Sequence, residues 1–174
     1  KLDLGLLCSE TPCAAAGVFT TNKVQAAPVV LSRERVASGR ARAIVVNAGC
    51  ANACTGEEGY RDAQEMALLA AEKLGIPSGG VLVASTGVIG HRLPMDKIRA
   101  GLKSIGLSRD GGSALARAIM TTDTFPKEAA ATGEVSRVQF TVGGIAKGAG
   151  MIHPNMATLL GFVATDVAVE ARFL

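Results

Sequence analysis

Thr158 offers the clearest chemistry in the chain, within the stretch GMIHPNMATLLGF near its end. A glycine-rich loop precedes this threonine, and an apolar run typical of a buried strand follows it. A threonine hydroxyl within a chain is a poor nucleophile, but breaking the Ala157–Thr158 bond would give Thr158 its own α-amine. Such an amine has a reference pKa of about 7.7–8.0 and can act as a base near neutral pH. Taken alone, the stretch favours a plainer interpretation, a strand that happens to begin with threonine.

The turn formed by Thr86 and Gly87 is a second candidate, because it follows the apolar run Val81–Ser85. Backbone amides in such a turn, together with a nearby hydroxyl, can converge on an oxygen that develops negative charge. Thr-Gly pairs are also common in ordinary turns between a strand and a loop. On its own this motif therefore favours the ordinary turn.

Two further polar features lie downstream, the Thr-Thr-Asp-Thr run at residues 121–124 and Lys147. Three hydroxyls around one carboxylate make a cluster that is costly to bury unless it is used, although a helix end or cap would also explain it. Lys147 lies in an apolar, glycine-rich stretch, where a lysine in a cleft could hold a carboxylate or change the pKa of a neighbour. Without other information, a surface lysine is the plainer interpretation.

Other kinds of catalytic site and metal site find little support. The chain has two histidines, His91 and His153, which are too few for a histidine-based metal cluster. One cysteine pair has the spacing of half a metal site, but no histidine lies near it. We therefore expect no bound metal, and we expect four small, buried, reduced thiols. These are Cys8, Cys13, Cys50 and Cys54.

The composition is that of a folded globular chain. Of its 174 residues, 48% are hydrophobic and 19% are charged, which argues against disorder. A net charge of +3 is too small to indicate a nucleic-acid partner. The longest apolar run has about half of the roughly 20 residues needed to cross a bilayer, so we expect no membrane segment and a cytoplasmic location. The chain starts at Lys1 without an initiator methionine, and we expect it to be a piece of a longer product.

Five apolar runs predict the strands that must position these residues. Two of them, around residues 43–47 and 81–85, are continuous rather than alternating, which is typical of strands covered on both faces. The predicted strands are Gly17–Thr20, Pro28–Leu31, Ala43–Asn47, Val81–Ser85 and Val138–Val142.

Helical spacing separates several of these runs. One helix is expected after Thr55, with Glu58 completing a capping box, and Gly75 should end it. A second should start at Pro94, and Ser113 can cap a third. The alternation of strands and helices predicts an α/β fold in one domain.

Four separated motifs, in order, resemble a known family: VVNAGCANACTG, ASTGVIG, MTTDTFPK and AKGAGMIHPNMATLLGF. Together they are similar to the bifunctional ornithine acetyltransferases (glutamate N-acetyltransferases) of arginine biosynthesis, over about Ala16 to Val169. The resemblance implies a layered α/β sandwich with mixed sheets, of the N-terminal-nucleophile type. It divides this single-domain fragment, residues 1–174, into an α chain at 1–157 and the start of a β chain at 158–174.

The resemblance also implies a specific chemistry. Members of the family cleave themselves at the position of Ala157 and Thr158, and the freed threonine carries the acetyl group from N-acetylornithine to glutamate in a ping-pong reaction. Transferred motif by motif, the implied site consists of Thr158 as nucleophile, Thr86 and Gly87 as the oxyanion hole, and Thr124, Lys147 and Thr158 as substrate contacts.

The family further implies that the chain's own β chain is its partner, in an assembly of two α and two β chains without a cofactor. Whether acetyl-CoA is also a donor, for N-acetylglutamate synthesis, stays open. Cys50 stands where a polar residue is expected in the asparagine-rich turn. Two alternatives remain at this point: an N-terminal-threonine amidohydrolase or aminopeptidase, in which water replaces glutamate, and a non-catalytic subunit.

Overall fold

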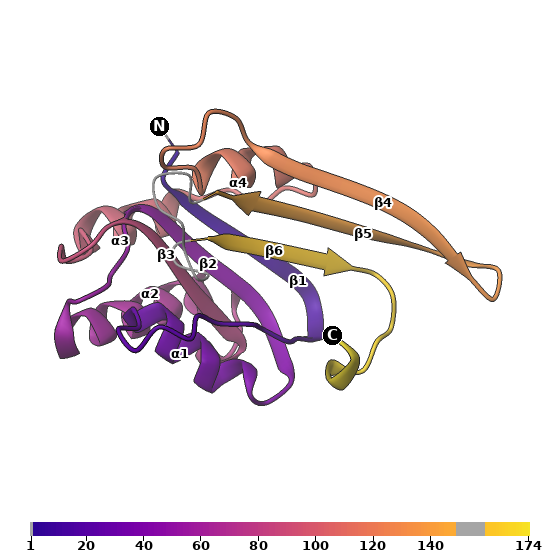
Figure 1. Cartoon of the computed structure of the whole chain (residues 1–174), viewed down its shortest axis with the longest axis horizontal. Helices are drawn as coiled ribbons and strands as arrows, with labels where there is room; N and C mark the ends of the chain where they lie inside the picture. The colour runs from indigo at the N-terminus through magenta and orange to yellow at the C-terminus, as the bar shows by residue number, and fades with distance from the viewer. Residues whose placement is uncertain (1, 149–158) are drawn as a thin grey trace.

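Two three-stranded sheets form the centre of the molecule, which a computed structural model describes over residues 2–148 and 159–174 (Figure 1). The first sheet has the order β1-β2-β3, with β1 antiparallel to β2 and β2 parallel to β3. It is therefore a mixed sheet. Its strands are β1 (Leu4–Ala14), β2 (Arg40–Cys50) and β3 (Val81–Val88).

The second sheet is antiparallel throughout, in the order β4-β5-β6. The hairpin of β4 and β5 extends to the right of Figure 1, away from the helices. The strands are β4 (Lys127–Val135), β5 (Val138–Lys147) and β6 (Leu160–Thr165).

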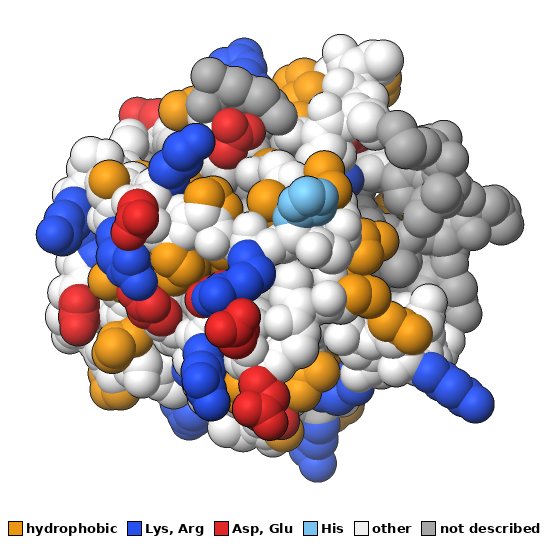
Figure 2. Space-filling view, turned by 90° about the vertical axis from the view of Figure 1, so that its left-hand side faces the viewer, with side chains coloured by type: hydrophobic (Ala, Val, Ile, Leu, Met, Phe, Trp, Pro, Cys, Tyr) orange, Lys and Arg blue, Asp and Glu red, His pale blue; other side chains and the backbone are white. Residues whose placement is uncertain are grey.

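Three helices cover one face of the first sheet: α1 (Ala27–Val36), α2 (Gly56–Leu74) and α3 (Met95–Ser104). Leu31, Met66 and Leu102, one from each helix, pack with Val45 and Val83 in one core cluster. Short 3-10 turns lie at Ser78–Gly80 and Ala171–Phe173. Figure 2 views the molecule from the left-hand side of Figure 1, where positive and negative side chains are interspersed.

The opposite face of the first sheet packs against α4 (Gly112–Ala118) and the second sheet. This second core cluster contains Val46 and Ala84 from the first sheet and Ile145 from the second. The layers are thus helices, a mixed sheet, and then a second sheet with α4. This arrangement confirms the predicted layered α/β fold, and it explains the continuous apolar runs of β2 and β3, which are covered on both faces. In the described part of the chain, none of the helices has the length and apolar character needed to span a bilayer.

Two of the five strand predictions are wrong. Pro28–Leu31 lies in α1, because Pro28 occupies one of the first helical positions, where its missing N–H costs nothing. Gly17–Thr20 is irregular. The runs at 43–47, 81–85 and 138–142 are confirmed as parts of β2, β3 and β5.

The helix limits agree better with prediction than the capping contacts do. The second helix, α2, begins after Thr55 and ends at Gly75 in the left-handed conformation, with φ 63°. The capping box is absent, because the Thr55 hydroxyl donates to Asn52 instead and Glu58 pairs with Arg92. The next helix, α3, begins just after Pro94, as expected. The Ser113 hydroxyl does not cap α4 but donates to Glu128.

Candidate functional site

The carboxyl ends of β2 and β3 lie side by side, because these two strands are parallel and in register. Asn47 pairs with Ser85, Ala48 with Thr86, and Gly49 with Gly87. The loops that follow the two strands therefore leave the same edge of the first sheet. Ligands bind preferentially at such carboxyl edges in open α/β sheets.

Gly87 occupies a position that only glycine can fill. Its φ is 131°, and a Cβ atom there would lie 2.7 Å from the backbone nitrogen of Cys50 and still closer to the carbonyl group of Gly49. Gly49 itself has a φ of 110°. Because neither Gly49 nor Gly87 has a side chain, their backbones can lie in direct contact. This contact positions the turn after β3.

Thr86 is almost completely buried, with 1% of its surface exposed. Within the described part of the chain, its Oγ1 is one of three buried side-chain atoms without a hydrogen-bond partner, together with Asn47 Oδ1 and Ser85 Oγ. Leaving such a group unpaired costs about 1–3 kcal/mol of stability, so each one needs a functional or structural explanation. Thr86 shares the face of Ala84, which packs toward the second sheet, whereas Ser85 shares the helix-covered face of Val83.

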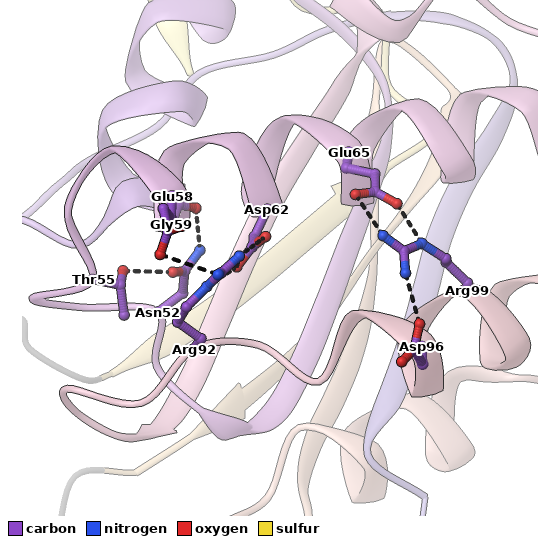
Figure 3. Close-up of polar contacts among 9 residues, drawn as sticks. All are labelled: Asn52, Thr55, Glu58, Gly59, Asp62, Glu65, Arg92, Asp96 and Arg99. Atoms are coloured by element: carbon purple, nitrogen blue, oxygen red, sulfur yellow. Dashed lines mark hydrogen bonds and ion pairs between the residues drawn. The ribbon is translucent and has the colours of Figure 1, made fainter.

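The loop between β2 and α2 is fixed by Asn52, which is fully buried and has a φ of 50°. Its Nδ2 donates to the carbonyl oxygen of Gly59 at 2.7 Å, and its Oδ1 accepts from the Thr55 hydroxyl at 2.7 Å (Figure 3). The amide of Ala51 donates to the carbonyl oxygen of Val88 at 2.9 Å. Asn52 therefore ties this loop to the start of α2, and Ala51 ties it to the segment after Gly87. Sequence reasoning missed this residue, and the positive φ that favours asparagine has no local signature.

Ion pairs connect the segment after β3 to α2. Arg92 binds both carboxylate oxygens of buried Asp62, at 2.9 and 3.3 Å, and also Glu58 at 3.1 Å (Figure 3). The hydrogen bonds from Arg92 to Asp62 raise the pKa of Arg92 above its ordinary value. Arg99 of α3 makes an equivalent contact with Glu65, so α3 is held on the same helix.

Lys147 ends β5 and is 3% exposed, so the plainer interpretation of a surface lysine is wrong. Alternate residues of a strand share a face, and Ile145, two positions earlier, packs in the core cluster against the first sheet. Lys147 accordingly lies on the side of β5 that faces the first sheet. Burial lowers the pKa of Lys147, Lys127 lowers it further, and Asp123 opposes both.

Asp123 is a buried carboxylate beside these lysines, with a side chain that is 2% exposed. Its Oδ1 accepts from Lys127 Nζ and from the amide of Gly148, both at 2.7 Å, and its Oδ2 accepts from the amide of Thr121 at 3.4 Å. Burial alone would raise the pKa of Asp123, but these three donors outweigh it and hold that pKa below the usual value. The expected cluster at 121–124 is therefore organised by backbone amides and Lys127, and Thr124 is exposed beside it. Sequence reasoning included the Asp123 carboxylate in this cluster but did not predict its contacts with Lys127 and Gly148.

The turn after β3 and the end of β5 lie on the same side of the molecule. In Figure 1, β1 starts at the upper left and the arrow of β5 points to the left. Because β2 and β3 run opposite to β1, the C-terminal ends of β3 and β5 share that side. Thr86 lies two residues after Ala84, and Lys147 lies two residues after Ile145. Ala84 and Ile145 belong to the same core cluster. The structure thus brings Thr86, Gly87 and Lys147 to one end of the two sheets, whereas Ala157 and Thr158 lie outside the described residues.

The cysteines differ from expectation. Cys8, Cys13 and Cys54 are exposed and Cys50 is half-buried, so the prediction of buried thiols is wrong. Cys8 and Cys13 lie in the edge strand β1, and Cys54 lies in the loop before α2. All four are free thiols, and the described residues contain no group of three or more potential metal ligands.

Two surface hollows in the described part of the chain lie away from this site. One, of about 670 Å³, is lined by residues 15–21 and α1, with Arg33 placed over the ring of Phe19. The other, of about 590 Å³, lies between α4 and the second sheet. Neither hollow is lined by Thr86, Gly87 or Lys147. The candidate site is therefore defined by its side chains and by the ends of its strands, and not by a surface hollow.

Comparison with known proteins adds a relationship along the whole chain. A family model described as the ArgJ family matches residues 1–174. The arginine biosynthesis bifunctional protein ArgJ of Symbiobacterium thermophilum is 61% identical over the whole chain, which covers 44% of that protein. The protein of the same name from Dehalococcoides mccartyi is 58% identical, with 43% of its length covered. The chain thus spans less than half the length of these curated relatives.

Two solved structures are similar to this fold. The ArgJ protein of Bacillus halodurans superposes with a TM-score of 0.84 at 47% identity, over 89% of this chain and 83% of that one. The ornithine acetyltransferase of Mycobacterium tuberculosis, solved in complex with ornithine, superposes with a TM-score of 0.76 at 42% identity. That alignment covers 91% of this chain and 84% of the other. The layered architecture is therefore that of the ornithine acetyltransferases.

Proposed function

The chain belongs to the ArgJ family, and from this premise we propose that it is part of an ornithine acetyltransferase of arginine biosynthesis. The enzyme would move the acetyl group of N-acetylornithine to glutamate. Two findings support this proposal: relatives that are 61% and 58% identical are named as bifunctional proteins of arginine biosynthesis, and a relative with the same fold was solved with ornithine.

In the proposed reaction, cleavage between Ala157 and Thr158 frees the α-amine of Thr158. That amine removes the proton of the Thr158 hydroxyl, whose oxygen attacks the acetyl carbonyl carbon of N-acetylornithine. The carbon–nitrogen bond breaks, the proton passes to the leaving amine, and ornithine departs. The amine of glutamate then attacks the acetyl-threonine ester, which gives N-acetylglutamate and restores the hydroxyl.

The observation that carries the proposal is the buried hydroxyl of Thr86 beside Gly87, which has no hydrogen-bond partner among the residues that the structure describes. Each tetrahedral intermediate puts negative charge on the former carbonyl oxygen. A donor already fixed in a buried environment stabilises that charge without reorganisation, and removing one such donor typically lowers kcat by about 10²–10³-fold. We assign Thr86 and Gly87 this role.

Lys147 would bind a carboxylate of the substrate, since N-acetylornithine and glutamate both carry one. A buried ammonium group gives a stronger interaction with a carboxylate than an exposed one, because solvent screens it less. Thr124, exposed next to Asp123, is the other proposed substrate contact in the described part. The proposal includes a β chain beginning at Thr158, an assembly of two α and two β chains, and a cytoplasmic location.

The test uses the full-length protein and its Thr158→Ala variant. We expect the intact mass of the wild type to show two chains separated at Ala157–Thr158, and the variant to remain whole. We also expect wild type to release ornithine from N-acetylornithine only in the presence of glutamate. The matched control is Thr132→Ala, an exposed threonine of β4, which should be processed and active.

Two results would contradict parts of this proposal, and a third would define its range of donors. An uncleaved wild type, with Thr158→Ala indistinguishable from it, would favour a non-catalytic subunit. Ornithine release that does not depend on glutamate would favour an N-terminal-threonine amidohydrolase. Formation of N-acetylglutamate from acetyl-CoA in the same assay would add that donor to the activity, and its absence would restrict the enzyme to N-acetylornithine.

A further inference from the structure

Asp123 holds its own turn, residues 121–127, against the end of β5. Its carboxylate accepts hydrogen bonds from Thr121 after α4, from Lys127 at the start of β4, and from Gly148 just beyond β5. The last two donors meet the same oxygen at 2.7 Å. A carboxylate that is 98% buried and accepts three bonds is a fixed structural point, because rotating it would break all three.

Gly148 connects the Asp123 carboxylate to the candidate site. Gly148 directly follows Lys147 and is the last described residue before the segment that contains Ala157 and Thr158. A Cβ atom on Gly148 would lie 3.2 Å from Asp123 Oδ1, so the backbone there lies tightly against the carboxylate. The Asp123–Gly148 hydrogen bond therefore holds the backbone directly after Lys147.

Charged groups from two other parts of the chain act on Lys147. They include Asp123, from the turn after α4, and Lys127, from β4. The residue opposite Lys147 in β6 is Leu160, which carries no charge. Two cations thus lie near one carboxylate, in a region where Lys147 itself is 3% exposed.

We propose that Asp123 is a positioning residue of the acetyl-transfer site: its carboxylate fixes the end of β5 and keeps Lys147 a cation that binds the substrate carboxylate. This inference rests on the proposed function, since it concerns the same site. Asp123 does not itself touch the substrate. Asp123 acts through Lys147, and its negative charge also interacts with Lys127.

The signs of the expected effects follow from electrostatics. Burial favours neutral Lys147 and lowers its pKa, Lys127 acts in the same direction, and Asp123 favours the charged form. Asp123→Asn should therefore lower the pKa of Lys147 further, whereas Lys127→Met should raise it. If Asp123 and Lys127 had merely structural roles, the two substitutions would not move the pKa of Lys147 in opposite directions.

The experiment measures kcat and KM for N-acetylornithine against pH in the full-length enzyme. For Asp123→Asn we expect the alkaline limb of kcat/KM to move to lower pH by about one unit, with KM about tenfold higher on that limb and kcat changed less. For Lys127→Met the same limb should move to higher pH. Asp123→Glu, which keeps the charge, should restore most of the wild-type profile.

The matched control is Asp110→Asn, which removes an exposed carboxylate from the loop before α4 and should leave the profile unchanged. The inference is overturned if Asp123→Asn behaves like this control, or if Lys127→Met moves the limb to lower pH. If Asp123→Asn does not accumulate as a folded protein, the upward shift in Lys127→Met decides the matter.

A second measurement separates this inference from the proposed function. Lysine side chains labelled with ¹³C at Cε report their own titration by NMR, and Lys147→Met assigns the Lys147 signal. We expect its midpoint to fall in Asp123→Asn and to rise in Lys127→Met, even if the protein transfers no acetyl group. Loss of acetyl transfer in wild type would count against the proposed function, whereas an unshifted midpoint would count against Asp123.

Discussion

The two halves of the candidate site are built in different ways. At the end of the first sheet, Thr86 and Gly87 are uncharged, and the turn is positioned by backbone contact with Gly49. At the end of the second sheet, the charges of Asp123 and Lys127 act on Lys147, and the Asp123 carboxylate holds the backbone directly after it. The activity that depends on Thr86 and Gly87 should therefore be sensitive to side-chain size and insensitive to pH. The activity that depends on Lys147 and Asp123 should be sensitive to pH and less sensitive to side-chain size.

This difference suits the chemistry that we propose. The oxyanion exists only in the transition states and intermediates, so a neutral, rigid donor is the best complement, because it leaves no charge unpaired in the resting enzyme. The substrate carboxylate is charged throughout the reaction, and a cation that is already balanced by Asp123 can bind it without isolating a buried charge.

Gly87→Ala should have the largest effect. The new Cβ would overlap the backbone of Gly49 at a φ of 131°, so the first-sheet turn must shift. We expect a loss of at least about 2–3 kcal/mol in the free energy of unfolding, and little acetyl transfer. Denaturant unfolding and steady-state kinetics measure these effects.

The control for that substitution is Gly106→Ala, because a Cβ at Gly106 meets nothing within 4 Å. This variant should stay within about 1 kcal/mol of wild type. Equal destabilisation by the two substitutions would contradict the close contact between Gly87 and Gly49.

Thr86→Val should separate activity from stability. The substitution keeps the branched shape but removes a buried hydroxyl that has no partner in the described part of the chain. We expect kcat to fall by about 10²–10³-fold. The free energy of unfolding should stay constant or rise by about 1 kcal/mol, because an unpaired polar group is removed. A parallel loss of stability would mean that Thr86 has a structural role, and Thr86→Ser should retain most of the activity.

Asn52→Ala should affect stability more than the chemistry. Two buried hydrogen bonds disappear, and the Gly59 carbonyl and Thr55 hydroxyl lose their partner. We expect a destabilisation of about 1–3 kcal/mol by denaturant unfolding. The exposed Asn22 provides the comparison, and Asn22→Ala should change stability by no more than about 0.5 kcal/mol. Equal effects in the two variants would show that Asn52 does not fix its loop.

The smallest effect concerns acid stability. The pKa of Asp123 is lower in the folded protein than its ordinary value of 3.8, so its contribution to stability is present above that value and is lost as pH falls through the folded pKa. Asp123→Asn should therefore show a shallower loss of stability below about pH 4 than wild type, in unfolding measured as a function of pH. Identical acid profiles would contradict the hydrogen bonds assigned to this carboxylate.

The sequence predicts those parts of the fold that depend on local patterns. The apolar runs of β2 and β3, the stripe of α2 and its end at Gly75 all follow from neighbouring residues. The run Pro28–Leu31 predicts a strand wrongly, because four apolar residues taken without the rest of α1 resemble one. The strand β4 was not predicted, because its alanines and charged residues give no alternating pattern.

For the site, the sequence motifs identify Thr86, Gly87 and Lys147 but not what holds them. Asp123 and Gly148 are 25 residues apart, and their hydrogen bond depends on how β4 and β5 pair. Asn52 bonds Gly59 across the start of a helix, and no residue pattern announces that contact. Such contacts are tertiary, so local patterns cannot reveal them.

The central claim is that Thr158 is the residue that carries the acetyl group. The most direct measurement incubates the full-length protein with N-acetylornithine labelled in its acetyl group, without glutamate, and locates the label by peptide mass spectrometry. We expect one labelled acetyl group on a chain that begins with Thr158, and its loss when glutamate is added. Label on another residue, or no label on a correctly cleaved protein, would contradict this claim.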